Sequence, residues 1–357
     1  MKMKSVFFSI ASVVLLVSSS ALISSCTKEG PAGPAGKDGI DGEDATATCV
    51  KCHDFSDDLL TKNFQYGNSV HASGAHLDHN TEGCAQCHTS QGFRMMIDSG
   101  IIAGIASPAP INCRTCHKIH ETYTPADFAL RTTAPVTMIM GGPAATYDYG
   151  TSNLCANCHQ GRTVKPFPVQ GGEPVTLTAA NARFGPHHAT QANMLLGEGA
   201  YEIPGSLPYS NSPHTNAVTK GCVTCHMDGN PMGIVAGGHQ MGLTYLSYGS
   251  PAKLLSGCTI SGCHTDAAAI KSAFEENRTE IMGLYAQLEE QLKALGWINP
   301  NTGLVVPGTY TQDQLGIILN QKFVEADYSN GTHNYRYTRA ILKNSLEALA
   351  TQSKARS

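Results

Sequence analysis

The feature that most constrains this chain is a short pattern, Cys-X-X-Cys-His, which recurs along 357 residues. Five copies begin at Cys49, Cys84, Cys113, Cys155 and Cys222, and a wider copy, with four residues between its cysteines, begins at Cys258. Two cysteines at this spacing can each form a thioether bond to a haem, and the histidine that follows can bind its iron. The pattern therefore predicts six covalently attached c-type haems.

The predicted attachment residues follow directly from these copies. The thioether cysteines are Cys49, Cys52, Cys84, Cys87, Cys113, Cys116, Cys155, Cys158, Cys222, Cys225, Cys258 and Cys263. The proximal iron ligands are His53, His88, His117, His159, His226 and His264. Zinc ribbons or disulfides are the alternative, but zinc does not require a histidine directly after every second cysteine. A disulfide stays open for the wider copy, because its longer loop must cross the porphyrin edge.

Each iron needs a second axial ligand, and the remaining histidines can supply one. The chain has 15 histidines, and subtracting the six proximal ones leaves nine for six irons. We expect the distal ligands to be His71, His120, one of His187 and His188, His214, His239 and His333. We expect His76 and His79 at the surface or beside haem propionates. Methionine, for instance Met138 or Met140, is the alternative ligand and would raise the potential of a haem.

Composition indicates how such a chain folds. Residues 49–264 are 216 residues for six motifs, or 36 for each, which is too few for a separate apolar core around every motif. The 36 glycines, 18 prolines and 15% charged residues are typical of a loop-rich chain. We therefore expect a mainly α, loop-rich fold with little sheet, in which the porphyrins form the core. The net charge of −4 argues against a nucleic-acid partner.

The N-terminus has the layout of a bacterial lipoprotein signal peptide. Lys2 and Lys4 precede an apolar run over residues 6–17, and small residues precede Cys26. We expect lipidation of Cys26 and an outer-membrane lipoprotein, on the periplasmic face or at the cell surface. A transmembrane anchor is the alternative, although the apolar run is short for one.

Residues 30–44 form five Gly-X-Y triplets, the repeat of collagen. As an extended spacer they would span about 45 Å, and as a short trimeric stalk they would join three copies of the chain. Both alternatives remain open. The expected organisation is a signal peptide over residues 1–25, a lipidated tether over 26–48, a hexahaem domain over 49–265 and a C-terminal helical region over 266–357.

The C-terminal region has helical patterning. Apolar residues recur at three- and four-residue steps from Ile270 to Leu295, which predicts an amphipathic helix ended by Gly296. Thr311 and Gln314 form a predicted capping box for a second helix to about residue 326. A third helix is predicted over about residues 334–350.

The motifs resemble those of multihaem c-type cytochromes in the broad group that includes pentahaem nitrite reductase, hydroxylamine oxidoreductase and octahaem tetrathionate reductase. The matching pieces, scattered over residues 49–345, are Ser69-Val-His71-Ala before CAQCHTSQGF, CANCHQGR from Cys155, GPHHATQANMLLGEGAYE from Gly185, CVTCHM with Gly238-His239, and Gly331-Thr-His333-Asn. The resemblance implies a hexahaem lipoprotein member whose SxHA, GGH and GxHN histidines are distal ligands. It also implies that the C-terminal helices fold back to supply the last ligand and that Arg162 pairs with a propionate; a surface arginine is the alternative.

Ligand supply separates a carrier from an enzyme. Histidine can saturate every predicted iron, and the chain has no Cys-X-X-Cys-Lys motif of the kind that commonly marks the catalytic haem of nitrite reductases in this group. We therefore expect a low-potential electron-transfer cytochrome that serves redox partner proteins or an external or periplasmic acceptor. Two alternatives stay open: a reductase or oxidase of nitrite, hydroxylamine or tetrathionate, and a subunit of an extracellular cytochrome filament.

Overall fold

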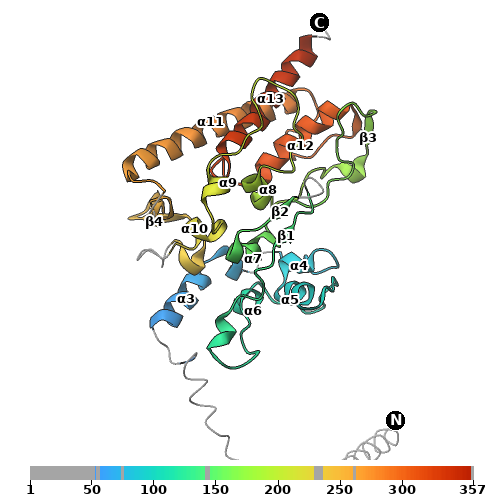
Figure 1. The fold of residues 1–357 in the computed structure, drawn as a ribbon. Helices are drawn as coiled ribbons and strands as arrows, with labels where there is room; N and C mark the ends of the chain where they lie inside the picture. The colour runs from blue at the N-terminus through green and yellow to red at the C-terminus, as the bar shows by residue number, and fades with distance from the viewer. Residues whose placement is uncertain are drawn as a thin grey trace, which may run out of the picture. The chain divides into compact units, whose positions relative to one another are not determined.

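The computed structural model describes residue 53 and residues 57–73, 76–140, 145–228, 236–259 and 263–354 (Figure 1). The chain divides into two units, Met1–Thr48 and Cys49–Ser357, and every described residue belongs to the second. The predicted signal peptide, Cys26, the Gly-X-Y triplets, Cys49 and Cys52 lie outside the described residues. Their assignments remain predictions.

The haem-motif region, residues 53–264, is built of short helices joined by long loops. They are α3 (Asp57–Gly67), η2 (Val70–Ser73), α4 (Ala85–His88), α5 (Ser90–Ser99), α6 (Cys113–Cys116), η3 (Pro125–Phe128), η4 (Gly150–Ser152), α7 (Asn153–Ala156), η5 (Ala179–Asn181), α8 (Gln191–Leu196), α9 (His214–Ala217), α10 (Cys222–His226), η6 (Gly238–Gln240) and η7 (Ser256–Cys258). The described attachment motifs form short helical turns, in α4, α6, α7, α10 and η7. The chain path between these turns is irregular, so the loops determine where each motif lies.

Sheet is limited to short antiparallel pairs in the part of the chain that the structure describes. Strands β1 (Val136–Thr137) and β2 (Thr146–Tyr147) pair, as do β4 (Thr244–Ser247) and β5 (Ser250–Lys253). Strand β3 (Val175–Leu177) pairs with β6 (Gly308–Tyr310), so it joins the motif region to the C-terminal region. The predicted fold class, mainly helical and loop-rich with little sheet, is confirmed.

The C-terminal region consists of three long helices, α11 (Ala267–Ala294), α12 (Gln312–Asp327) and α13 (Tyr335–Lys354). The Asp266 carboxylate caps α11, which ends just before Gly296, a residue with a positive φ of 72°. Thr311 and Gln314 form the predicted capping box of α12. All three predicted helices are present, and α13 packs against α11 and α12 (Figure 1).

The main apolar core belongs to these three helices. It includes the fully buried Ile281 and Leu288 of α11, Leu315 and Phe323 of α12, and Ile341 of α13. Side chains from the loop after the fourth motif, among them Phe184, Met194 and Tyr201, complete it. A second, smaller apolar cluster lies in the motif region around Tyr147.

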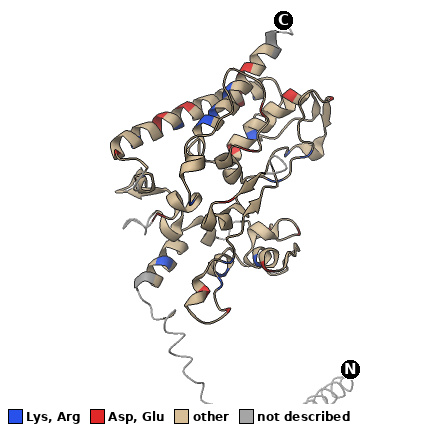
Figure 2. Ribbon diagram, viewed as in Figure 1, with Lys and Arg blue, Asp and Glu red and all other residues tan. Residues whose placement is uncertain are grey.

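Charged side chains are concentrated on the C-terminal helices. Figure 2 shows acidic and basic positions along α11, where Lys293 and Glu289 form an ion pair one turn apart, with 3.1 Å between Nζ and Oε1. Such exposed pairs contribute little to stability, so the apolar face of α11 holds the helix in place. Within the described residues, no helix has both the length and the apolar character that crossing a bilayer requires.

Candidate haem-binding cavity

A cavity of about 2930 Å³ runs through the motif region. Five proximal histidines of the predicted haem sites line it: His88, His117, His159, His226 and His264. Dividing 2930 Å³ by five gives about 590 Å³ for each motif. Sites that enclose a small organic molecule commonly measure roughly 300–1,000 Å³, so the space fits one flat cofactor beside each of these motifs.

The predicted axial histidines lie in pairs across this region. Each proximal ring lies 6.0 to 6.3 Å, centre to centre, from the ring of a predicted distal histidine. The pairs are His53 with His120 at 6.2 Å, His88 with His187 at 6.3 Å, His117 with His239 at 6.1 Å, His159 with His71 at 6.0 Å, His226 with His333 at 6.2 Å and His264 with His214 at 6.2 Å.

This spacing fits a metal ion bound between two opposed imidazoles. A metal–nitrogen bond is about 2.0 Å and the nitrogen lies about 1.1 Å from its ring centre, so two opposed rings stand about 6.2 Å apart. Two imidazoles on a tetrahedral zinc would be nearer, with centres about 5 Å apart. The six pairs therefore match the axial geometry of a bis-histidine haem, and the cysteines beside each proximal ring supply the means of attachment.

The distal histidines come from segments remote in sequence from the motifs they face. His71 lies in η2, His214 in α9 and His239 in η6. His333 lies in the loop between α12 and α13, so the C-terminal region does reach a motif of the cavity. Each ring pair thereby brings together two stretches of chain that are far apart in the sequence.

Burial favours the neutral, metal-binding form of six of these rings. Only a neutral imidazole presents a free lone pair to a metal. Desolvation by burial lowers the pKa of His159 to about 4. It also lowers the pKa of His187 to about 4, with a further contribution from the positive charge of Arg162. Burial is likewise the largest cause of a lowered pKa at His71, His88, His214 and His226.

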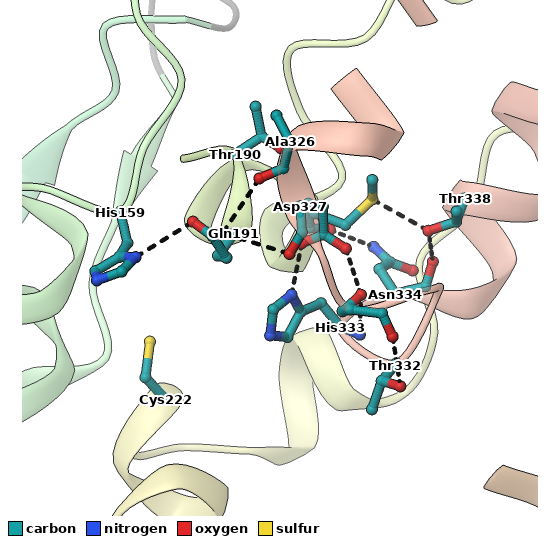
Figure 3. A network of polar contacts seen from close by, with 12 residues as sticks. His159, Thr190, Gln191, Cys222, Ala326, Asp327, Thr332, His333, Asn334 and Thr338 are labelled. Carbon is teal, nitrogen blue, oxygen red and sulfur yellow. Dashed lines mark hydrogen bonds and ion pairs between the residues drawn. The ribbon is translucent and has the colours of Figure 1, made fainter. Parts of the chain in front are cut away.

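Hydrogen bonds at Nδ1 orient four of the rings and leave Nε2 for a metal. Metal-bound histidines commonly donate their second N–H in this way. The Nδ1 partners are the Phe128 carbonyl oxygen for His117 at 2.6 Å, the Met241 carbonyl oxygen for His226 at 2.8 Å, the Gln191 Oε1 for His159 at 3.3 Å and the Asp327 Oδ1 for His333 at 2.6 Å. Figure 3 shows the last two.

His88 has the most crowded surroundings. Besides His187 at 6.3 Å, its ring lies 6.2 Å from His76 and 4.8 Å from His79. His188 lies beside His187, with ring centres 5.2 Å apart, so the structure places His187, rather than His188, against a proximal ring. His76 and His79 therefore lie beside the second attachment motif.

Arg162 belongs to the same surroundings. Its positive charge contributes to the lowered pKa of both His88 and His187, after burial in each case. Its guanidinium donates to the Gly83 carbonyl and its backbone N–H donates to the Pro186 carbonyl at 2.9 Å. Arg162 therefore links the segment before the second motif to the loop that carries His187.

Successive motifs lie in contact with one another. The Cys87 and Cys158 thiols lie close enough to shift each other's pKa, and so do the thiols of Cys155 and Cys222. The backbone of Gly257, beside Cys258, lies against that of the fifth motif, so that an added Cβ would meet the Thr224 oxygen at 2.7 Å. The second, fourth, fifth and sixth motifs thus form a continuous series.

Close packing at the fifth motif depends on one glycine. Gly221 has a φ of 55°, and a Cβ there would lie 2.5 Å from Tyr147 Oη and 2.8 Å from Tyr149 Cβ. The Tyr147 hydroxyl in turn lies 3.1 Å from Cys222 Sγ. Only a residue without a side chain allows the fifth motif to lie against Tyr147 and Tyr149, which precede the fourth motif.

Three polar residues of the site escaped sequence reasoning. Asp327 and Gln191 orient His333 and His159, and the fully buried Asn334 ties the His333 loop to two other segments. Its side chain donates to the Met194 carbonyl at 3.0 Å and accepts from the Ser212 N–H at 2.8 Å. No motif marks Asp327, because its role depends on the loop that follows α12.

Met138 and Met140 are not placed to take the role of the distal histidines. Met138 and Met140 are both buried in the apolar clusters, 6% and 2% exposed. The Met140 sulfur packs against Gly161, where an added Cβ would approach it to 2.8 Å. Both methionines therefore act as packing residues.

No protein-family model and no curated protein matches the chain. Among solved structures, the chain is similar to the crystal structure of the outer cell wall cytochrome OcwA, with a TM-score of 0.49 and 17% sequence identity. The similarity covers 80% of this chain and 49% of the other, so the chain spans about half the length of that structure. At a TM-score below 0.5 and so low an identity, the function of that protein is not transferred to this chain.

Proposed function

We propose that the protein is a hexahaem c-type cytochrome that transfers electrons between redox partners. The observation that carries this proposal is the set of six histidine pairs with ring centres 6.0 to 6.3 Å apart. Each pair combines the proximal histidine of one attachment motif with a histidine from another segment. Two imidazoles saturate an iron, which favours electron transfer over substrate binding.

Each group of residues has a defined role in this proposal. The twelve motif cysteines attach the haems, and the paired histidines hold each iron from both faces. When bound, the haems supply iron that alternates between the ferric and ferrous states. The protein orients four of the rings through their Nδ1 partners and encloses the second to sixth motifs in one cavity, which limits the rearrangement that accompanies a change of charge.

The contacts between motifs support the transfer role. Cys87 meets Cys158, Cys155 meets Cys222, and Gly257 meets Thr224. Because these residues belong to or adjoin four different motifs, neighbouring sites lie close together. A series of adjacent sites suits conduction along the molecule and is not required by a single catalytic centre.

The proposed location is the outer membrane, outside the cytoplasm. Lipidation of Cys26 and a Gly-X-Y tether over residues 30–44 would hold the described unit at a distance from the lipid surface. We propose a redox protein or an external or periplasmic acceptor as the partner. This part of the proposal rests on the sequence.

A second candidate is a reductase or oxidase of a small nitrogen or sulfur compound. The observation in its favour is the cluster around His88, where His76, His79 and Arg162 add donors beyond the axial pair. Groups of this kind could orient an anion if His187 left the iron. This candidate function places the substrate-binding iron at the second motif.

Spectroscopy of the intact, haem-loaded protein tests the proposal. Mass measurement should give six attached haems, and paramagnetic resonance should show only low-spin iron. Added nitrite, hydroxylamine or carbon monoxide should leave the spectra unchanged. Fewer than five attached haems would overturn the proposal, and a high-spin signal abolished by nitrite would favour the second candidate.

A further inference from the structure

The distal ring of the fifth motif has a carboxylate as its partner at Nδ1. Asp327, the last residue of α12, is 1% exposed, and its Oδ1 lies 2.6 Å from the Nδ1 of His333 (Figure 3). His333 faces His226 with a ring separation of 6.2 Å. A buried carboxylate therefore stands directly behind one proposed axial ligand.

The loop between α12 and α13 holds this carboxylate in place. Tyr328, Asn330 and Gly331 all have positive φ values, which turn the chain back on itself within a few residues. The Ser329 hydroxyl donates to the second carboxylate oxygen of Asp327 and accepts from the His333 N–H at 3.2 Å. Arg278 of α11 donates to the Ser329 carbonyl at 3.0 Å, so the loop is tied to a second helix.

Three proximal rings of the cavity have neutral partners at Nδ1. His117 and His226 face backbone carbonyl oxygens, and His159 of the fourth motif faces the amide oxygen of Gln191. The Gln191 Nε2 donates to the Ala326 carbonyl at 3.2 Å and to the Asp327 carbonyl at 3.4 Å. The end of α12 therefore supports two neighbouring sites, one through a neutral amide and one through a charged carboxylate (Figure 3).

The charge of the partner changes what the imidazole does to an iron. A carboxylate draws the Nδ1 proton toward itself and makes the ring a stronger electron donor, whereas an amide or carbonyl oxygen does so less. The effect is larger for a buried pair, where water does not screen the negative charge. A more electron-rich ligand stabilises the ferric state over the ferrous state and so lowers the reduction potential.

We propose that Asp327 is a positioning residue that makes His333 an electron-rich axial ligand, so that the haem attached at Cys222 and Cys225 has a lower potential than the haem attached at Cys155 and Cys158. The inference rests on the proposed function, since it requires His333 to bind iron. It adds a direction to the series of sites: electrons pass more readily from the fifth site to the fourth than back.

The test is the substitution Asp327→Asn in the full, haem-loaded protein, followed by a redox titration monitored by paramagnetic resonance. Asparagine keeps the shape and an acceptor oxygen but removes the charge. One of the six midpoint potentials should shift to a more positive value, its haem should stay low-spin, and its g values should change. The matched control is Asp313→Asn, which alters a carboxylate at the other end of α12 that accepts from Tyr201 Oη at 2.6 Å and should shift none.

Ser329→Ala provides a second test with the opposite sign. Removing the Ser329 hydroxyl leaves more negative charge on the carboxylate for His333, so the same potential should shift to a more negative value. This variant keeps the proposal testable if Asp327→Asn fails to accumulate. Unchanged potentials in both variants, equal shifts in Asp313→Asn, or conversion of a haem to high-spin iron in Asp327→Asn would overturn it.

Failure of the proposed function would look different. In that case His333→Ala would leave every iron low-spin, or the purified protein would carry no covalent haem. If His333→Ala produces one high-spin haem while Asp327→Asn shifts no potential, His333 is a ligand and the carboxylate only holds the loop.

Discussion

The haem-motif region and the C-terminal helical region differ in what fills their interiors. The helical region packs side chains such as Leu288, Leu315 and Ile341 into a core with no exposure to solvent. The motif region encloses a cavity of about 2930 Å³ lined by histidines and cysteines. One region thus forms its core from its own side chains, while the other, on the proposed function, would be completed by its haems.

The difference also appears in the hydrogen bonds. The α12 capping box uses neighbouring residues, Thr311 and Gln314, whereas the motif region relies on contacts such as Tyr149 to the Thr215 carbonyl between distant loops. Local contacts form without help, but distant ones need something to hold the loops together. The ring pairs, joined through iron, would do so.

The largest effect we expect is from preventing haem attachment altogether. Protein made without haem maturation should keep the helical signal of α11–α13 but lose protection of the motif region. Hydrogen exchange measured by mass spectrometry would show this, with fast exchange over residues 57–264 apart from the loop that packs on the helices. Equal protection of both regions would show that the motif region needs no cofactor to fold.

A core substitution in the helical region should have the next largest effect on stability. Leu288 is completely buried, so Leu288→Ala should lower the free energy of unfolding of this region by about 2–5 kcal/mol. The control is Leu295→Ala, at a residue that is 41% exposed and should cost far less. Denaturant unfolding followed by circular dichroism would measure both, and the number of attached haems should not change in either.

A substitution of the buried Arg131 tests how much a polar network contributes to the stability of the motif region. Its side chain, 2% exposed, donates to Asp98, to Glu121 and to the backbone carbonyls of Arg114 and His117. Arg131→Met should cost about 1–3 kcal/mol, at the low end because both carboxylates are about two-fifths exposed. We expect the loss to appear as faster exchange around the third motif with α11–α13 unaffected, and a global loss would contradict the separation of the two regions.

Removing one distal ring should alter a single site without unfolding either region. His333→Ala should convert one of six haems to high-spin iron, as seen by paramagnetic resonance, because the sixth position loses its ligand. His188→Ala is the matched control, since its ring lies beside His187 and faces no proximal ring at the axial spacing. An unchanged spectrum for His333→Ala would remove that assignment.

The smallest predicted effect is a pH dependence confined to the helical region. Burial works to raise the pKa of Glu280, but hydrogen bonds from Tyr335 and Arg339 outweigh it, and the pKa is lowered. The ionised carboxylate therefore stabilises the fold above the carboxyl pKa of the unfolded chain, and this contribution is lost as the pH falls through the lower, folded value.

For this exposed cluster we expect the contribution to be below about 1 kcal/mol. The difference in melting temperature between the wild-type protein and Glu280→Gln should be present at pH 7 and vanish at pH 3. A difference that persists at pH 3 would assign the effect to packing rather than charge. Arg339→Gln should reproduce the pH 7 difference, because it removes the other end of the same ion pair.

What could be predicted from the sequence was local. The attachment motifs, the α12 capping box and the end of α11 at Gly296 all depend on residues close together in the chain, and periodicity or spacing reveals them. It could also be predicted that histidines outside the motifs are candidate distal ligands, because the proposed irons need more axial ligands than the motifs supply.

What could not be predicted depends on the path of the loops. Nothing in the spacing says that His71 faces the fourth motif or that His187, and not His188, faces His88. The β3–β6 pairing, which lies between residues more than a hundred positions apart, has no local signal. The role of Asp327 could not be predicted for the same reason. Its carboxylate contacts His333 only because the turn at Tyr328 folds the chain back.

The position of His333 after the fifth motif in the sequence has a consequence for the proposed loading with haem. If the protein is exported and loaded with haem as proposed, the cysteines of the fifth motif are made and exported well before the segment that carries His333, so a haem could be attached there while its distal side is still uncovered. Docking of the last two helices then covers it. A nascent chain that stalls before His333 would therefore leave the iron of the fifth site without its proposed distal ligand.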